Sequence, residues 1–319
     1  MAFRVGQMCI LLKLGLLLCT LQQGLVSVEA WGADGHHITC LLAEPLLTPS
    51  ALAGVRSLLP EYANGSLASL CTWPDDVRWM WKWQWTSPLH YIDTPDFYCN
   101  YNYARDCHNE KGQQDFCVAG GINNYSSQLL TYHASGSALG TESSLKAKAG
   151  YNLTEALLFL AHFMGDIHQP LHVAFTGDAG GNTIILHWYT RKYNLHHIWD
   201  TEFIARARDY LYDSDLSAFQ DALFRNITTT WLKDTADWAQ CPDGALVCPD
   251  LIADESIILA CKWAYRNATA GTTLEDDYFY SRLPIVNQQL AKGGVRLAAV
   301  LNRIFSKESA PAFSNKAVL

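Results

Sequence analysis

The sequence predicts a mainly α-helical protein, a single compact helical domain with a small β-hairpin and several disulfides. Several segments repeat apolar residues at the 3.6-residue spacing of helices, which favours helices packed around one core. The 319 residues contain no internal repeat and no low-complexity linker, and this length allows one large domain or two small ones. Eight cysteines follow residue 30, and an even number in an exported chain indicates disulfides.

Residues 1–30 have the pattern of a secretory signal peptide. A positive residue lies near the start, residues 10–18 are almost all apolar, and residues 28–30 fit the small-x-small cleavage pattern. The alternative, a membrane anchor, needs about 18 uncharged apolar residues, and this stretch is shorter. We therefore expect a mature domain over residues 31–305, followed by a polar tail over residues 306–319 that is disordered or trimmed.

The first half of the mature chain combines helical and irregular segments. Residues 36–58 have helical periodicity, with Ile38 and several leucines recurring at helical spacing. Residues 73–85 are rich in tryptophan, and we interpret them as a buried helix rather than a stacking platform. Residues 96–121 carry many Cys, Asn, Tyr and Gly residues and are typical of a loop closed by disulfides.

The second half is predicted to be mostly helical. Residues 153–167 form the strongest helix, which Asn152 or Thr154 can cap and which Pro170 ends. Residues 182–189 alternate in polarity and indicate a short strand or one arm of a hairpin. Further helical patterns cover residues 195–207, 215–239, 251–270 and 283–305.

Composition restricts the classes of function. The formal net charge is −8, which argues against a nucleic-acid binder that works through a basic surface. It does not exclude one whose attraction for phosphate comes from bound metal. None of the eight cysteines forms a Cys-x-x-Cys pair, so a thiolate zinc site is not expected. N-glycosylation is expected at several of the acceptor sites Asn64, Asn124, Asn152, Asn226 and Asn267.

Histidine and aspartate recur at the spacing of a metal site. His162 and Asp166 are four residues apart, which places them on one face of a helix. His196 and Asp200 repeat this spacing, and His172 lies between the two pairs. Nitrogen and oxygen ligands without thiolates suit zinc in a catalytic, partly open site.

Removal of the signal peptide would create one more ligand. Cleavage after Ala30 would leave Trp31 as the new N-terminus, five residues before His36. Its α-amine, with a pKa of about 7.7–8.0, can bind a metal once it is deprotonated. Cleavage of the signal peptide would therefore complete the predicted metal site.

Five ordered motifs together resemble the zinc-dependent single-strand-specific nucleases, above all the plant bifunctional nucleases of the endonuclease type. The resemblance runs from residue 31 to about residue 305. It implies a helical fold of the zinc phospholipase C and single-strand nuclease type, with three zinc ions at the bottom of a cleft. The motifs cover residues 31–36, 73–75, 89–91, 162–172 and 194–200.

The resemblance also implies a set of ligands, none of which is substituted in this sequence. The first zinc would be bound by Asp75, His90, His162 and Asp166, the second by His172, His196 and Asp200, and the third by the amine and carbonyl of Trp31, by His36 and by a shared Asp166. The implied disulfides join Cys40 to Cys71, Cys99 to Cys248, Cys107 to Cys117 and Cys241 to Cys261.

Further residues receive roles in the reaction from the same resemblance. A water between two zinc ions would attack phosphorus in line, and Arg78 with the third zinc would stabilise the phosphoryl oxygens. Asp75 could also orient or deprotonate that water. Tyr91 would stack on a base, Asp93 would accept hydrogen bonds from the base edge, and Asn182 would line the cleft. Bases can be stacked in this way only in single strands.

The implied function is a secreted zinc-dependent endonuclease that hydrolyses single-stranded DNA and RNA to 5′-phosphorylated products, with 3′-nucleotidase activity. We expect a glycosylated monomer without stable membrane association, delivered to the extracellular space or the vacuole. The main alternative is a zinc phospholipase C, which has a similar fold and ligand set, but Tyr91 and Asp93 favour nucleotides. A secreted zinc-binding glycoprotein without activity is the second alternative, and the intact ligands and Arg78 argue against it.

Overall fold

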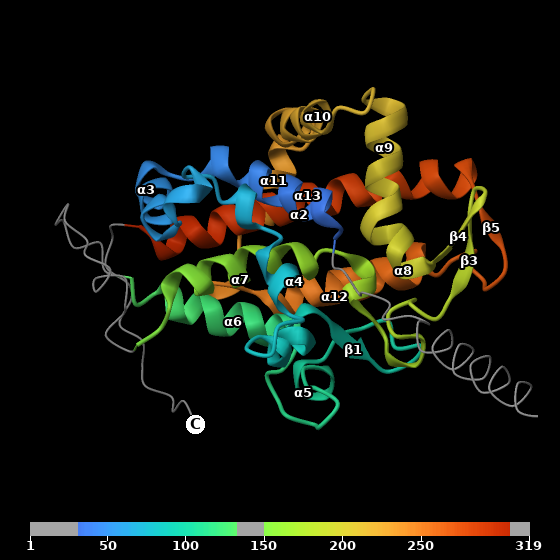
Figure 1. Ribbon diagram of the computed structural model, residues 1–319, viewed down its shortest axis with the longest axis horizontal. Helices are drawn as coiled ribbons and strands as arrows, with labels where there is room; N and C mark the ends of the chain where they lie inside the picture. The colour runs from blue at the N-terminus through green and yellow to red at the C-terminus, as the bar shows by residue number, and fades with distance from the viewer. Residues whose placement is uncertain (1–30, 133–149, 307–319) are drawn as a thin grey trace, which may run out of the picture.

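Helix α13 (Asp276–Ile304) crosses most of the width of the molecule, and the other helices pack around it (Figure 1). The computed structural model describes residues 31–132 and 150–306. The predicted signal peptide, and all of the predicted tail except Ser306, lie outside the described residues. Helices predominate among the residues described, so the prediction of a mainly helical fold is confirmed.

Helix α7 (Leu153–Asp166) is the buried centre of this packing. The side chain of Asn152 accepts a hydrogen bond from the backbone N–H of Glu155 and thereby caps the first turn. Residues 156–166 are all buried, because α7 packs against α6 (Val118–Leu129), α13 and α2 (Ala33–Ala43). Polar side chains at the end of α7 are therefore held away from water.

A short parallel ladder joins two segments that are far apart in the sequence. Strand β1 (Ile92–Thr94) pairs with β2 (Val173–Phe175), with Ile92 opposite Val173. β1 begins two residues after His90, and β2 begins directly after His172. The ladder therefore brings two of the predicted metal ligands to the same part of the molecule.

The predicted hairpin is also present. Strands β3 (Ile185–Trp188) and β4 (Arg191–Asn194) are antiparallel, and β5 (Thr273–Leu274) pairs in parallel with β3. This small sheet lies at one end of the molecule (Figure 1). The chain passes from β4 straight into the helical segment that carries His196 and Asp200.

The remaining elements are helices and short helical turns, of which η8 and η10 are π-helical. They are η1 (Glu44–Leu46), α3 (Pro49–Leu58), η2 (Glu61–Ala63), η3 (Ala68–Leu70), α4 (Trp73–Val77), η4 (Gln84–His90), α5 (Tyr103–Asp106), η6 (Pro170–His172), η7 (Thr176–Asp178), α8 (Leu195–His197), η8 (Ile198–Glu202), α9 (Phe203–Leu211), α10 (Leu216–Thr228), α11 (Leu232–Trp238), η9 (Pro242–Gly244), α12 (Pro249–Leu259) and η10 (Ala260–Ala264).

The tryptophan-rich segment corrects one prediction. We expected a buried helix over residues 73–85, but α4 ends at Val77 and the chain continues through turns into η4. The exposed fraction is 51% for Trp79 and 90% for Trp81, whereas Trp83 is buried. The spacing explains the error, because tryptophans two residues apart cannot share one face of a helix.

Four disulfides form among the described residues, and two of them are those implied by the resemblance. Cys40 is bonded to Cys71, which ties α2 to the segment before α4, and Cys107 is bonded to Cys117, which closes a short loop. The other two bonds are Cys99–Cys261 and Cys241–Cys248.

The expected pairings of Cys99 with Cys248 and of Cys241 with Cys261 are therefore wrong. Cys241 and Cys248 lie on either side of the η9 turn, and their Cα atoms are 5.6 Å apart, so the local turn brings them within bonding range. The segment that carries Cys99 is held beside α12, because the backbone N–H of Tyr101 donates a hydrogen bond to the carboxylate of Asp254 in α12. The next cysteine there is Cys261 in η10.

Two surface features bear on the expected export of the chain. The predicted glycosylation sites Asn64, Asn124, Asn152 and Asn267 are exposed, and Asn226 is half-buried. Their occupancy remains a prediction. Over residues 31–132 and 150–306, no helix has the length and apolar character needed to cross a membrane.

Candidate functional site

All the predicted histidine and aspartate ligands converge in the interior. They form three groups in which the ligand atoms lie within 4.8 Å of one another. Two of the groups share His162, and the three together draw on α2, α4, η4, α7, η6 and the α8–η8 segment. The members are His36, His162 and Asp166 in the first group, Asp75, His90 and His162 in the second, and His172, His196 and Asp200 in the third.

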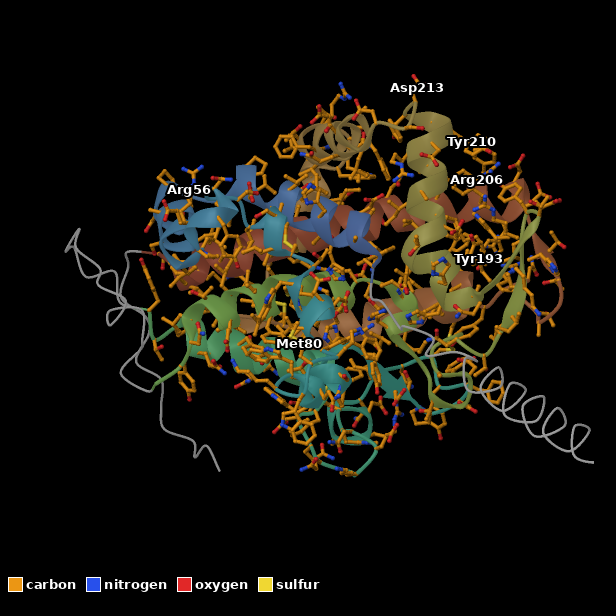
Figure 2. All side chains as sticks on the ribbon, viewed as in Figure 1. Arg56, Met80, Tyr193, Arg206, Tyr210 and Asp213 are labelled. Carbon is orange, nitrogen blue, oxygen red and sulfur yellow. A yellow bond between two sulfur atoms is a disulfide. The ribbon has the colours of Figure 1, made fainter. Side chains whose placement is uncertain are left out.

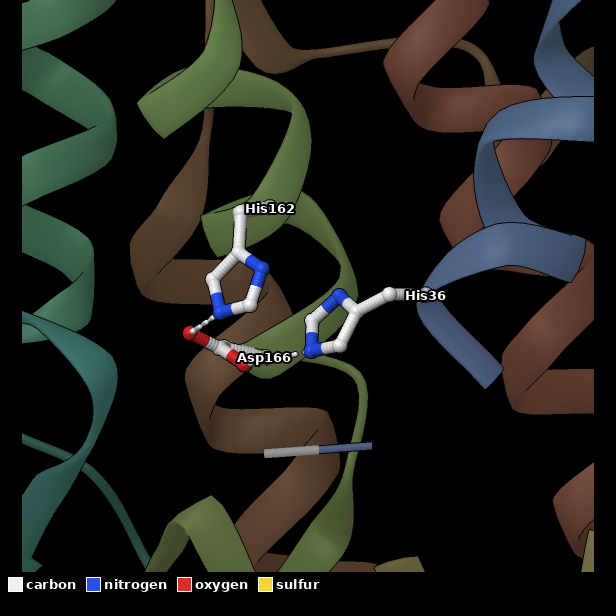
Figure 3. A group of neighbouring side chains, drawn as sticks. All are labelled: His36, His162 and Asp166. Carbon is white, nitrogen blue, oxygen red and sulfur yellow. Dashed lines mark ion pairs between the residues drawn. The ribbon is translucent and has the colours of Figure 1, made fainter. Parts of the chain in front are cut away.

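The last turn of α7 supplies the centre of the first group. His162 and Asp166 are one turn apart, and Nε2 of His162 is 3.4 Å from Oδ2 of Asp166. His36 approaches from α2, with its Nε2 3.3 Å from Oδ1 of Asp166 (Figure 3). The rings of His36 and His162 stack with centroids 3.7 Å apart. Gly165 permits this approach, because a Cβ atom there would lie 2.7 Å from Nδ1 of His36.

The second group extends from the same turn. Nδ1 of His90 is 3.1 Å from Oδ2 of Asp166 and 3.5 Å from Oδ1 of Asp75. Nε2 of His162 is 3.5 Å from Oδ2 of Asp75. The four residues that we predicted as ligands of the first zinc therefore meet at one point.

The third group lies on the far side of His90. Nε2 of His172 and Nε2 of His196 are 3.1 Å apart, and Nε2 of His196 is 3.2 Å from Oδ2 of Asp200. His196 lies in the short α-helical turn α8, and Asp200 lies in the π-helical turn that follows. Such π-helical turns are frequent at functional sites.

Backbone carbonyls fix the orientation of three of the rings. Nδ1 of His162 lies 2.7 Å from the carbonyl of Cys71, and Nδ1 of His172 lies 2.7 Å from the carbonyl of His90. Nδ1 of His196 lies 2.7 Å from the carbonyl of Gly180. Since a carbonyl can only accept, each Nδ1 must donate. This leaves Nε2 of each ring directed into the cluster, as in histidines that bind metal.

The cluster leaves several buried acceptors without donors. The lone pairs of His172 and His196 face each other at 3.1 Å, an arrangement that is repulsive without a cation. Within the described part of the chain, neither carboxylate oxygen of Asp166 accepts a hydrogen bond, although both are buried. Unpaired buried acceptors are costly. The donor set therefore fits divalent cations.

Burial shifts the pKa values of the candidate ligands and so favours metal binding. Burial lowers the pKa values of His36, His90 and His172 well below the ordinary histidine value, and it lowers the pKa of His196 to about 4. These rings are neutral at mild pH and need not lose a proton to bind a metal. Burial raises the pKa of Asp166 well above its usual value, and the neighbouring carboxylates add to this effect. A bound cation would offset that destabilisation.

The pKa of Asp75 is shifted in the opposite direction to that of Asp166. Burial alone would raise the pKa of its carboxyl, but His162, His90 and Arg78 outweigh burial and hold the pKa below the usual range. Asp75 is therefore ionised. Nη1 of Arg78 is 3.3 Å from Oδ1 of Asp75. Nε and Nη2 of this buried guanidinium have no hydrogen-bond partner among the residues described, so they are available to an anion beside the cluster.

Trp31 lies next to the third group. Its side chain is fully buried, and the backbone N–H of the following Gly32 donates a hydrogen bond of 2.9 Å to the carbonyl of Asp200. Helix α2, which carries His36, starts at Ala33. The beginning of the expected mature chain is therefore held at the cluster. Binding of a metal by a freed amine stays a prediction.

The predicted substrate-binding residues flank the cluster on two sides. Tyr91 and Asp93 follow His90 and are half-buried, and burial raises the pKa of Tyr91 to about 12. Asn182 is also half-buried, and its Nδ2 donates to the carbonyl of Ala179 in the loop that orients His196. Their roles toward a base stay predictions.

One polar residue at the site was not predicted from the sequence. Nε2 of Gln169 donates a hydrogen bond of 2.5 Å to Oδ1 of Asp200, and Oε1 of Gln169 accepts from the backbone N–H of Leu171. Gln169 thus fixes the orientation of a candidate ligand. Its only signal in the sequence is its place between His168 and Pro170, since an uncharged side chain does not suggest a metal site.

Comparison with known proteins places the chain in a class. The family model described as S1/P1 nuclease matches residues 31–306. The chain is 52% identical to Endonuclease 4 of Arabidopsis thaliana over 278 residues, which cover 87% of this chain and 90% of that protein. It is 54% identical to Endonuclease 2 of the same plant over 279 residues, covering 88% and 92%.

A third relative, Endonuclease 1 of Arabidopsis thaliana, is 49% identical over 310 residues, and the match covers 97% of each chain. The fold, the buried cluster and these matches define the protein as a nuclease. It belongs to the S1/P1 nuclease family.

Proposed function

We propose that the protein is a zinc-dependent endonuclease that hydrolyses phosphodiester bonds of single-stranded DNA and RNA to 5′-phosphorylated products, and that it also acts as a 3′-nucleotidase. The observation that carries this proposal is the buried cluster, in which neutral imidazoles direct their lone pairs at one another and at carboxylates. Membership of the S1/P1 nuclease family supports nucleic acid as the substrate.

The cluster would hold three zinc ions. Nitrogen and oxygen donors without thiolates suit catalytic zinc, and the three groups of candidate ligands supply these donors. Zinc in such a site supplies Lewis acidity toward phosphoryl oxygens and acidifies water. We assign one of the three ions to His36 and Asp166 of the first group, together with the freed amine and carbonyl of Trp31.

The chain's own residues would position the substrate. The two unpaired N–H donors of Arg78 would bind oxygens of the reacting phosphate, because Arg78 is buried beside the cluster. Asp75 would orient the attacking water. Tyr91 would stack on one base, and Asp93 would accept hydrogen bonds from its edge, with Asn182 at the cleft wall. A duplex cannot offer an unstacked base, so single strands would be preferred.

We further propose that the enzyme is exported, glycosylated and monomeric, without stable attachment to membranes. The disulfides and the exposed acceptor asparagines support an oxidising compartment. The destination would be the extracellular space or the vacuole.

The decisive experiment places one extra residue before Trp31 and compares this variant with protein whose N-terminus is Trp31. We expect the extension to displace the amine, to lower the zinc content by about one ion per chain, and to reduce cleavage of single-stranded DNA by about tenfold or more. Zinc would be counted by mass spectrometry in the same samples. Full zinc content with full activity in the extended variant would contradict the assignment of Trp31.

The same preparations distinguish the alternatives. Hydrolysis of single-stranded DNA, duplex DNA and phosphatidylcholine micelles would be compared before and after chelation. Turnover of lipid alone would identify a phospholipase C, and bound zinc without any turnover would identify an inactive glycoprotein.

A further inference from the structure

Three tryptophans that follow Arg78 lie open to solvent. The exposed fractions are 51% for Trp79, 90% for Trp81 and 50% for Trp85. We call these three residues the tryptophan ridge. Met80 between them is also exposed, at 56%, and lies on the face shown in Figure 2. Apolar groups gathered at the surface in this way mark a contact site.

The ridge is rigid because Trp83 anchors it. Trp83 is buried, and its ring contacts Trp73 at 5.4 Å and Phe159 at 5.6 Å between ring centroids. The backbone N–H of Trp83 donates a hydrogen bond of 2.8 Å to the carbonyl of Met80, and the hydroxyl of Thr86 donates to the carbonyl of Trp83. The backbone that carries the exposed rings is therefore held in place before any partner binds, which lowers the entropic cost of binding.

The ridge is continuous with the candidate catalytic site. The ring of Trp79 lies 4.9 Å from Cζ of Arg78, in a cation–π contact. Arg78 in turn contacts Asp75 of the metal cluster. A nucleic-acid strand that placed a phosphate on Arg78 would thus meet the ring of Trp79 next, and then the other two rings of the ridge.

The charge beside the ridge fits a polyanion. Lys82 lies within the same segment, and its ammonium group sits 4.1 Å from the ring centroid of Trp83. Its side chain is 70% exposed, although it also approaches Glu155. In a protein of net charge −8, this segment therefore combines flat aromatic faces with two cations, the combination that binds single-stranded nucleic acid.

We propose that the tryptophan ridge stacks unpaired bases of a single-stranded nucleic acid on one side of the reacting phosphate. This inference rests on the proposed nuclease function and extends it from a single nucleotide to a longer strand. The ridge would make long single strands better substrates than dinucleotides or 3′-mononucleotides. A lipid surface would also accept exposed tryptophans, but the direct contact of Trp79 with the guanidinium beside the cluster favours the strand that is being cleaved.

The test uses Trp81→Ala and the double variant Trp81→Ala with Trp85→Ala. Trp79 is left intact, because its ring contacts Arg78. We expect KM for a single-stranded DNA of about 20 nucleotides to rise about tenfold in the double variant, with kcat and the hydrolysis of a 3′-mononucleotide unchanged. Tyr210→Ala is the matched control, because Tyr210 is 69% exposed and lies on α9, well away from Met80 in Figure 2.

Binding is measured separately, by fluorescence anisotropy with a phosphorothioate strand of the same length on the zinc-loaded enzyme. Wild-type Kd and KM in the double variant would overturn the proposal, and so would loss of binding to phosphatidylcholine vesicles with normal cleavage of the strand. If wild-type protein bound the strand but cleaved no nucleic acid, the proposed function would fail. Weaker strand binding in the double variant would then still support the ridge.

Discussion

At the scale of single residues, the approach of α2 to α7 depends on a glycine. Gly165 lies between two candidate ligands, and the imidazole of His36 occupies the space where a side chain would begin. The two stacked rings and the carboxylate of Asp166 are therefore compatible only with a residue that lacks Cβ.

We predict that Gly165→Ala lowers metal content by about one ion per chain and nuclease activity by about tenfold or more. Alanine favours a helix interior over glycine by roughly 0.5–1 kcal/mol, so α7 itself should form at least as well. The new Cβ would displace His36. Metal content by mass spectrometry and activity on single-stranded DNA are the measurements.

Gly121→Ala is the matched control for this variant. Its Cβ would press on the ring of Phe163, 2.9 Å away, where α6 packs on α7, and this side chain is not a candidate ligand. We expect it to lower stability and keep the metal. Equal metal loss in both variants would show that the effect is general loosening of α7.

The sequence predicted the charged and imidazole ligands but not the groups that orient them. His162 and Asp166 are recognisable because a helix brings residues four apart onto one face. The carbonyl groups that fix the rings have no signature in the residue type, because every residue has one. Gln169 was missed for a related reason, since only the tertiary structure shows that its amide reaches Asp200.

At the scale of elements, a partly buried ionic network joins α12, α13 and the end of α7. Glu255 of α12 pairs with Lys292 and Arg296 of α13. Nη1 of Arg296 donates to Nε2 of His168 at 2.9 Å, and Nδ1 of His168 donates to the carbonyl of Met164. Burial lowers the pKa of His168 to about 3, so this ring is neutral and can accept from arginine.

We predict that Glu255→Gln lowers the free energy of unfolding by about 1–3 kcal/mol at neutral pH, because two partly buried cations lose their charged partner. Burial alone would raise the pKa of Glu255, but Arg296 and Lys292 outweigh burial and hold this pKa below the ordinary glutamate value of 4.5. The ionised form therefore stabilises the fold fully above about pH 4.5, and this stabilisation is lost as the pH falls through the folded-state pKa. The difference between the two proteins should shrink in acid.

Urea unfolding of both proteins after chelation, at pH 7 and below pH 4.5, measures this difference without interference from metal loss. Glu155→Gln serves as the control, because Glu155 pairs with the exposed Lys82 and should contribute less than about 1 kcal/mol. A difference for Glu255 that is the same at both pH values would contradict the role assigned to its charge.

Elements were predicted well where several local signals agreed. For α7, the apolar periodicity, the cap at Asn152 and the stop near Pro170 all marked the same helix, and its end differs by one residue from the prediction. For the tryptophan-rich segment, composition suggested burial, but composition does not specify which rings face the core. Trp73 and Trp83 pack against Phe159 in the interior, whereas the three rings of the tryptophan ridge are exposed.

At the scale of the whole molecule, the disulfides differ greatly in the length of the loop that they close. Cys99–Cys261 links residues 162 apart in the sequence, whereas Cys241–Cys248 links residues only 7 apart. The sequence could not predict these pairings, because they depend on how α12 and η10 pack against the segment around Tyr101.

We predict that replacing Cys99 and Cys261 by serine lowers the free energy of unfolding by about 4–5 kcal/mol, because the unfolded chain regains the entropy of a long loop. The same change at Cys241 and Cys248 should cost about 2 kcal/mol. Denaturant unfolding at equal zinc content compares the two double variants. A larger effect for the short loop would mean that local strain or packing, rather than chain entropy, determines the stabilisation.

Cys71 takes part both in a disulfide and in the orientation of a candidate metal ligand. Its sulfur is bonded to Cys40 in the helix of His36, and its carbonyl orients His162. If the chain carries the leader that we predict and is exported as we propose, a newly made chain in the reducing cytosol would lack both this bond and the free amine of Trp31. Assembly of the proposed hydrolytic centre would then wait for oxidation and leader removal, and the cell's own transcripts would be spared until that point.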